Sequence, residues 1–237
     1  MKIKTVLFDL DGTLLPMDLD QFVKVYLGAL ADHLVPYGYD RQELIGGIWA
    51  GMKAMLGNDG SRRNEDAFWE AFARHMKRDV RVDEPLFEAF YREKFDALAT
   101  VCGYTADAKQ AVDYLKERGI CTVLATNPAF PSIATEKRMR WAGVEPSDFV
   151  HFTTYENSHY CKPNPEYYRE ILDRLGLRAE DCLMVGNDVT DDMVAEMLGM
   201  KVFLLTDWLI NKPAVDINRY PHGGYAQLMK YLEENCG

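Results

Sequence analysis

Apolar residues recur with two different spacings along this chain, and the change in spacing divides the chain into three parts. Residues 6–8 form a short apolar run of strand-forming residues, which is too short for a typical helix and is soon followed by the turn-forming pair Gly12-Thr13. Apolar residues then follow a helical spacing up to about residue 98, and from residue 105 short apolar runs alternate with helical patterns. The pattern therefore predicts a strand, a helical block and an alternating α/β segment.

The helical block contains four segments in which apolar residues share one helix face. These segments lie at residues 22–34, 44–56, 68–76 and 87–98. Consecutive amphipathic helices with little strand signal predict a small helical bundle, and we expect its aromatic residues to form the bundle core. The block also carries Lys53, Arg62 and Arg63, which are candidate ligand contacts but are equally consistent with a solvated surface.

The segment after residue 105 alternates between strands and helices. The predicted strands lie at residues 120–125, 149–153, 182–186 and 202–205. The predicted helices lie at residues 105–118, 131–143, 164–175, 191–198 and 225–232. This alternation favours parallel strands joined by right-handed crossovers. The predicted fold is an α/β, doubly wound (Rossmann-like) parallel sheet core at residues 1–15 and 99–237, interrupted by an all-helical domain at residues 16–98.

The composition narrows the classes of partner. Hydrophobic residues make up 48% of the 237 residues, enough for a substantial core, and the net charge is −10 with no run rich in Lys or Arg. An acidic chain of this kind is not expected to bind nucleic acid or an anionic membrane surface. No apolar stretch approaches the roughly 20 residues that span a bilayer. The oligomeric state, monomer or homodimer, is left open.

The cysteines bear on the cellular compartment. The five cysteines are an odd number and include no C-x-x-C pair. They indicate reduced thiols in a cytoplasmic protein and neither a disulfide framework nor a zinc site.

Two carboxylates, Asp9 and Asp11, follow the first strand. Ligands of open α/β sheets bind at the carboxyl ends of the strands, so these acids are expected in a ligand crevice. Their mutual repulsion favours a bound cation, and Mg²⁺ suits oxygen ligands while keeping waters that a phosphate displaces. One carboxylate could attack phosphorus and the other could act as general acid and base. Taken alone, the pair is equally consistent with ordinary turn acids.

Polar residues also follow two of the other predicted strands. Thr126 and Asn127 end the strand at residues 120–125, and a run of acids at residues 187–192 follows the strand at 182–186. Lys162 precedes a strongly marked helix start at Asn164-Pro165-Glu166. We expect these groups at the same sheet edge as Asp9, where Lys162 could neutralise a carboxylate and the charge on a phosphoryl group.

The run Asp9-x-Asp11-Gly12-Thr13-Leu14 resembles the first motif of the haloacid dehalogenase (HAD) superfamily, in the form that its phosphatases carry. In that family the first Asp is the nucleophile and the second Asp is the general acid and base. The dehalogenases of the superfamily lack the second Asp. The position and helical character of residues 16–98 resemble the superfamily's C1 cap. The resemblance implies a lid over the two acids.

The remaining motifs follow in the family's order. Thr126, with the Asn127 backbone, is similar to the second motif and Lys162 to the third, which implies phosphate binding. Residues 186–192 resemble the fourth motif but place Asn187 where the first acid usually stands. The resemblance implies that Asp9, the Asp11 backbone carbonyl and Asp188 hold Mg²⁺. It also implies that Asn187 and Asp192 lie next to the metal ligands without binding the metal themselves. Asp192 is expected to hold Lys162 or the waters on the metal, whereas Asp191 is expected to be exposed.

The predicted function is a Mg²⁺-dependent phosphatase, a phosphoric monoester hydrolase that acts on a small phosphorylated metabolite through an aspartyl-phosphate intermediate. Two alternatives stay open at this stage. One is a phosphomutase on the same scaffold, in which a phosphorylated sugar and not water receives the phosphoryl group. The other is a phospho-accepting signalling module, against which the lid-sized insertion and Asp11 both speak. The physiological substrate is not predicted.

Overall fold

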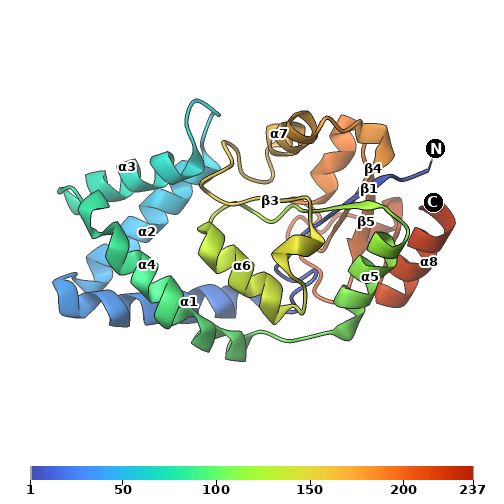
Figure 1. The fold of residues 1–237 in the computed structure, drawn as a ribbon. Coiled ribbons are helices and arrows are strands. Elements are labelled where there is room, and N and C mark those ends of the chain that lie inside the picture. Colours follow the sequence, from blue (N-terminus) through green and yellow to red (C-terminus); the bar gives the residue numbers. More distant parts are fainter. Residues whose placement is uncertain (1, 237) are drawn as a thin grey trace.

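A six-stranded parallel sheet forms the centre of the structure, a computed structural model that describes residues 2–236 (Figure 1). The strands are β1 (Thr5–Phe8), β2 (Cys121–Leu124), β3 (His151–Phe152), β4 (Cys182–Gly186), β5 (Lys201–Leu205) and β6 (His222–Gly223). Their order is β3-β2-β1-β4-β5-β6, and every neighbouring pair is parallel. Since β1 lies between β2 and β4, the chain turns in opposite directions on its two sides, which is where such sheets bind ligands.

Helices cover both faces of the sheet. Val6 and Phe8 of β1 belong to an apolar cluster shared with α5 (Ala106–Glu117), α6 (Ser132–Trp141) and α8 (Tyr225–Asn235). Leu7 points to the opposite face and joins a second cluster with α7 (Pro165–Leu175). Successive side chains of a strand alternate between the faces, so one buried strand supplies both layers. The predicted doubly wound parallel fold is confirmed.

The segment between β1 and α5 is helical and lies to one side of the sheet (Figure 1). Its helices are α1 (Leu19–Leu34), α2 (Arg41–Leu56), α3 (Asn64–Met76) and α4 (Glu84–Glu93). Gly51 lets α2 and α3 approach closely, because a Cβ atom there would lie 2.3 Å from the Phe68 ring. We call residues 19–93 the helical insertion.

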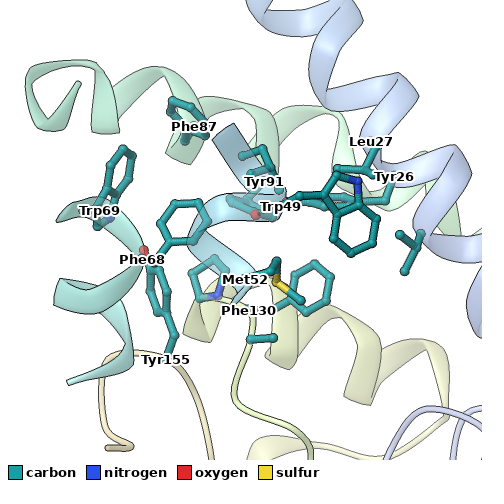
Figure 2. A pocket seen from close by; sticks show the side chains of 14 residues that line it. Tyr26, Leu27, Trp49, Met52, Phe68, Trp69, Phe87, Tyr91, Phe130 and Tyr155 are labelled. Carbon is teal, nitrogen blue, oxygen red and sulfur yellow. Dashed lines mark hydrogen bonds between the residues drawn. The ribbon is translucent and has the colours of Figure 1, made fainter. Parts of the chain in front are cut away.

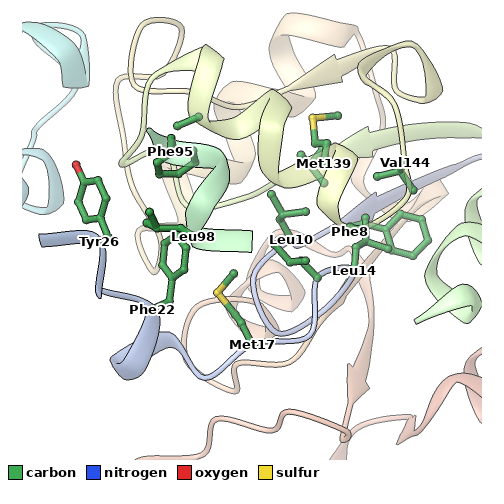
Figure 3. Close-up of a cluster of buried hydrophobic side chains, with 14 of the residues drawn as sticks. Phe8, Leu10, Leu14, Met17, Phe22, Tyr26, Phe95, Leu98, Met139 and Val144 are labelled. Carbon is green, nitrogen blue, oxygen red and sulfur yellow. The ribbon is translucent and has the colours of Figure 1, made fainter. Parts of the chain in front are cut away.

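One apolar cluster joins the sheet to the helical insertion. Figure 3 shows Phe8 and Leu14 on one side and Phe22 and Tyr26 of α1 on the other, with Leu10 and Met17 among the side chains between them. Phe22 and Phe95 are fully buried, and their rings meet edge to face with centroids 6.4 Å apart. The insertion therefore packs against the part of the core that follows β1.

Three predicted elements differ from those observed, and one observed strand was not predicted. The predicted helix at residues 191–198 is a 3₁₀ segment, η6 (Met193–Leu198), and residues 95–101 also form a 3₁₀ helix and do not continue α4. The Ala195 N–H bonds to the carbonyl three residues earlier, and i, i+3 apolar spacing does not distinguish the two helix types. The strand predicted at 149–153 has only two residues, and β6 was not predicted because His222-Gly223 lacks strand-forming side chains.

Two expectations about the whole chain also have an outcome in the structure. No helix within residues 2–236 is both long enough and apolar enough to span a membrane. All five cysteines are free, as the spacing predicts.

Candidate active site

Asp9 and Asp11 lie at the carboxyl end of β1, as predicted. The Asp9 N–H donates to the Val185 carbonyl at 2.9 Å, so the backbone pairing with β4 continues to the first of the two acids. Gly12 then turns the chain with φ +85°, and a Cβ atom there would lie 2.3 Å from the Asn187 amide nitrogen. Because only glycine fits this close approach, the turn fixes Asp9 and Asp11 beside the loop that follows β4.

Lys162 lies between two carboxylates in the interior. Its Nζ atom is 2.8 Å from Asp9 Oδ1 and 2.6 Å from Asp192 Oδ1, and its side chain is 1% exposed. Burial disfavours the charged amine, but Asp192 and Asp9 together outweigh burial and hold the pKa of Lys162 well above its usual value. Lys162 therefore stays an ammonium group and fixes the orientation of Asp9.

Asp192 is the third member of this buried group. Burial raises the pKa of its carboxyl group, and Asp9 adds to the increase, whereas the Lys162 ammonium group opposes it. Its second oxygen, Oδ2, accepts the Asp188 N–H at 2.9 Å. Asp192 thus contacts Lys162 through one oxygen and the loop after β4 through the other.

Thr13 and Asn187 lie on the other side of the Asp9 carboxylate. The Thr13 hydroxyl is 3.2 Å from Asp9 Oδ2 and 3.1 Å from Asn187 Oδ1. The Asn187 amide nitrogen donates to the Trp208 carbonyl at 2.6 Å, which orients its Oδ1 atom toward Thr13. Sequence reasoning gave Thr13 no role of its own, although it lies in the same motif as Asp9.

Thr126 and Asn127 follow β2 and reach the same region. The Thr126 carbonyl accepts the hydroxyls of Thr153 at 2.6 Å and Tyr167 at 2.8 Å, which fixes the loop from the side of α7. The Asn127 amide nitrogen lies 3.4 Å from Asp191 Oδ2, and its buried Oδ1 atom makes no hydrogen bond in residues 2–236. Both side chains line the pocket that Asp9 lines.

The acids after β4 differ from the prediction in one respect. Asp188 lines the pocket, and its Oδ1 atom accepts the N–H groups of Thr190 at 2.6 Å and Asp191 at 3.0 Å. Asp191 was expected to be exposed, but it is partly buried and also lines the pocket. Burial raises the pKa of Asp191 to about 6, with a further contribution from Asp188. The prediction for Asp191 was wrong because this residue lies in the turn that follows Asp188, where the Asp192 N–H donates to the Asp188 carbonyl, and this turn borders the pocket.

Arg138 of α6 is a site residue that sequence reasoning missed. Its guanidinium group is fully buried, forms an ion pair with Asp11 Oδ2 and lies 4.4 Å from the centre of the Phe130 ring. Burial raises the pKa of Asp11, and the positive charge of Arg138 opposes that increase. The other carboxylate oxygen, Asp11 Oδ1, is buried without a hydrogen-bond partner in the described chain.

All eight predicted site residues border one pocket of about 680 Å³. They are Asp9, Asp11, Thr126, Asn127, Lys162, Asn187, Asp188 and Asp192. Residues 19–56 of the helical insertion form the facing wall. Arg62, Arg63 and Lys53 do not border this pocket and are exposed, and Arg62 forms an ion pair with Glu70. A pocket of this size suits a small molecule, and we call it the catalytic pocket.

The donor set of the catalytic pocket fits a hard cation. Among the described residues, no three Asp, Glu, His or Cys side chains form a metal cluster by themselves. Mg²⁺ needs no such cluster, since one or two carboxylates, water and substrate oxygens complete its coordination. The carboxylates of Asp9 and Asp188 supply anionic oxygen atoms at the pocket.

Comparison with known proteins adds independent information. A family model described as haloacid dehalogenase-like hydrolase matches residues 3–199. The chain is 24% identical over 200 residues to the pyrophosphatase PpaX of Bacillus velezensis, covering 84% of this chain and 82% of that protein. It is also 24% identical over 200 residues to the phosphoglycolate phosphatase of Pectobacterium atrosepticum, covering 84% and 78% of the two chains.

A solved structure shares the fold over almost the whole chain. The crystal structure of a HAD phosphatase from Thermococcus onnurineus superimposes with a TM-score of 0.60 at 19% identity. The alignment covers 97% of this chain and 98% of that one. At this identity the similarity establishes the fold and leaves the chemistry to the residues of the site.

Proposed function

Since the chain belongs to the haloacid dehalogenase-like hydrolases, we propose that it is a Mg²⁺-dependent phosphatase that hydrolyses a small phosphorylated metabolite through an aspartyl-phosphate at Asp9. The names of its relatives support hydrolysis of phosphate compounds, because they include a pyrophosphatase and a phosphoglycolate phosphatase. The size of the catalytic pocket, about 680 Å³, supports a small substrate.

The observation that carries this proposal is the position of the Asp9 carboxylate. One of its oxygens contacts the Lys162 ammonium group at 2.8 Å and the other contacts the Thr13 hydroxyl at 3.2 Å. A nucleophile must be held in one orientation toward the reacting atom, and these two contacts hold the carboxylate from two sides. In the proposed reaction, an Asp9 oxygen bonds to phosphorus as the bond to the leaving oxygen breaks.

Asp11 is proposed to move protons in both halves of the reaction. It protonates the leaving oxygen when the ester bond breaks, and it later accepts a proton from the water that attacks the aspartyl-phosphate. That attack releases phosphate and restores the Asp9 carboxylate. The raised pKa of Asp11 supports the first of these roles, because a raised pKa favours the protonated acid.

The remaining side chains bind the phosphoryl group and the cation. Lys162 and the Thr126 hydroxyl, with the Asn127 backbone, are proposed to hold phosphoryl oxygens, whose charge grows as the group is transferred. Asp9, the Asp11 backbone carbonyl and Asp188 would hold Mg²⁺, with Asn187 beside them. When bound, the cation offsets the repulsion between the phosphate and the carboxylates.

Chelation is the direct test of the metal requirement. We expect EDTA to reduce phosphate release from small phosphate esters to background and added Mg²⁺ to restore it, because the site concentrates carboxylates that a phosphate dianion cannot approach alone. The measurement is inorganic phosphate released per unit time, with heat-inactivated protein as the control. Full activity after chelation and desalting would contradict the metal requirement.

A second prediction concerns Arg138. Replacing Arg138 with methionine is expected to move the alkaline limb of the kcat/KM pH profile to higher pH. Arg138 favours the ionised form of Asp11 and therefore lowers its pKa, so its removal leaves Asp11 protonated up to a higher pH. Because kcat/KM follows the cleavage of the ester, for which Asp11 must be protonated, the active range extends in the alkaline direction.

The matched control for Arg138→Met is Arg140→Met on the same helix. Arg140 is exposed, whereas Arg138 is buried. Arg140 pairs with Glu136 and Glu145 at the surface. This control is expected to leave the pH profile unchanged, and Arg138→Lys is expected to restore most of the original profile. An alkaline limb that does not move in Arg138→Met would show that Arg138 has no effect on Asp11.

A further inference from the structure

A second cavity, of about 90 Å³, lies beside the catalytic pocket and is lined by apolar side chains of the helical insertion (Figure 2). All four helices α1–α4 contribute to it, and the loops after β2 and β3 add Phe130 and Tyr155. Figure 2 shows Phe68, Tyr155, Met52 and Phe130 around a common space. The cavity is several times larger than one water molecule requires, and its walls are too apolar to hold water well. We call it the aromatic cavity.

The aromatic cavity and the catalytic pocket share part of their walls. Six residues line both of them: Val23, Leu27, Trp49, Met52, Ala129 and Phe130. Phe130 comes from the loop that carries Thr126 and Asn127, so this wall links phosphate-binding residues to the insertion. The organic part of a substrate whose phosphate lies at Asp9 therefore faces residues that also line the aromatic cavity.

Large apolar side chains are also exposed where the helical insertion faces the catalytic pocket. Leu19 is 41% exposed, and Trp49 and Leu56 are each 51% exposed, although all three line the pocket. Exposed apolar side chains that gather at a concave site mark a surface that a ligand covers. The only charged residues that the insertion contributes to this pocket are Asp20 and Lys24, which have opposite signs.

We propose that the aromatic cavity and this apolar wall bind the organic part of the substrate, so that the preferred substrates are phosphate monoesters whose alcohol ends in an apolar group of about one aromatic ring. This inference rests on the proposed phosphatase function and adds the class of substrate. The occupant is the distal part of the molecule whose phosphate binds at Asp9 and Lys162, because the cavity shares six lining residues with the catalytic pocket. The cavity also adjoins a third pocket on the side of α3 and α4, but five glutamates line that pocket and would repel a phosphate ester.

The side chains of the aromatic cavity suit a ring better than a second anion. Tyr26 and Phe130 already meet edge to face with centroids 5.1 Å apart, and a bound ring extends such contacts. The hydroxyls of Tyr26 and Tyr91 hydrogen-bond to each other at 2.7 Å, so they are engaged within the wall. Met52 is flexible and adapts its shape to an inserted group. A second anionic group would find only the exposed Lys24 and Lys212 at the rim of the catalytic pocket.

The test compares two substrates that share a primary alkoxide leaving group. We expect kcat/KM for 2-phenylethyl phosphate to exceed that for ethyl phosphate by at least about tenfold, which is the gain from burying most of a phenyl ring. Equal kcat/KM values would overturn the inference and leave the phosphatase proposal intact. Phosphate release from neither compound would overturn the proposed function and, with it, this inference.

A matched pair of variants tests the position of the binding site. Val23→Phe adds a ring at the shared wall and is expected to remove most of the preference, measured as the ratio of the two kcat/KM values so that a general loss of activity cancels. Val25→Phe makes the same change on the same helix at a position that is 37% exposed and lines neither cavity. It is expected to keep the ratio, and a ratio preserved in Val23→Phe would overturn the assignment.

Inhibition of the unaltered protein keeps the proposal testable even if Val23→Phe does not fold. The two non-hydrolysable analogues are 2-phenylethylphosphonate and ethylphosphonate. We expect the aromatic compound to inhibit at a concentration at least about tenfold lower. Equal inhibition constants would show that the cavity is a packing defect of the insertion and not a substrate site.

Discussion

Replacing Asp9 with asparagine is expected to lower phosphate release by roughly 10⁴-fold or more, as removal of a catalytic nucleophile does in other enzymes. An amide oxygen carries no negative charge and does not attack phosphorus at a useful rate, and the proposed mechanism has no second nucleophile. The remaining groups of the pocket would still bind phosphate, so the loss should appear in kcat more than in KM.

The fold should survive this change. Lys162 keeps its contact with Asp192 at 2.6 Å, and the asparagine retains an oxygen that can face Lys162 or Thr13. Circular dichroism and thermal unfolding are expected to show a native-like protein. Asp32→Asn, which removes a surface partner of Arg41, is the matched control and should keep full activity. An Asp9→Asn protein with substantial turnover would contradict nucleophilic catalysis by this residue.

Replacing Lys162 with methionine is expected to affect stability and activity together. The ammonium group lies between the carboxylates of Asp9 and Asp192, and its removal leaves two buried acids without a cation. Breaking a buried ion pair in this way typically costs about 3–5 kcal/mol. Urea unfolding measures this loss, and phosphate release should fall to background because the phosphoryl oxygens also lose a positive partner.

A double substitution separates the two effects. Lys162→Met combined with Asp192→Asn removes one of the stranded carboxylates, so part of the lost free energy of unfolding should return while activity stays absent. Lys109→Met breaks a solvent-exposed pair with Asp113 and should change stability by less than about 1 kcal/mol. A Lys162→Met protein as stable as the original would show that the contacts around Lys162 contribute little.

The location of the site could be predicted from sequence because strand ends are visible in the pattern. Asp9 and Thr126 each follow an apolar strand run, and the carboxyl ends of neighbouring parallel strands share one edge. Lys162 lies on no strand, and only its motif and the marked helix start pointed to the same place. The roles given to these residues remain predictions, whereas their convergence on one pocket is observed.

Arg138 was missed because nothing in its neighbourhood resembles a site. It lies within α6, one turn after Ala134 and Thr135, and both of those residues are buried. An arginine on the buried stripe of a helix must find an anion, since a buried charge is rarely left unpaired. The position of Arg138 on that stripe therefore indicates a buried ion pair. It does not identify Asp11 as the partner, because the pairing depends on how α6 packs beside β1.

The aromatic cavity could not be predicted for a different reason. The aromatic residues of the helical insertion were expected to form a core, and Phe72 and Phe90 do so with no exposure. Phe68 and Phe87 follow the same helical spacing but line the cavity. Core residues and cavity walls need the same apolar side chains, so the periodicity cannot show where packing is incomplete.

Trapping the covalent intermediate tests the central claim most directly, namely that the Asp9 carboxylate accepts the phosphoryl group at this sheet edge. The protein is mixed with a substrate labelled in its phosphoryl group, quenched within the first turnover and digested, and the labelled peptide is identified by mass spectrometry. The account predicts a phosphoryl label on Asp9 that is absent from Asp9→Asn. A label on any other residue, or phosphate release without labelled protein at any quench time, would contradict it.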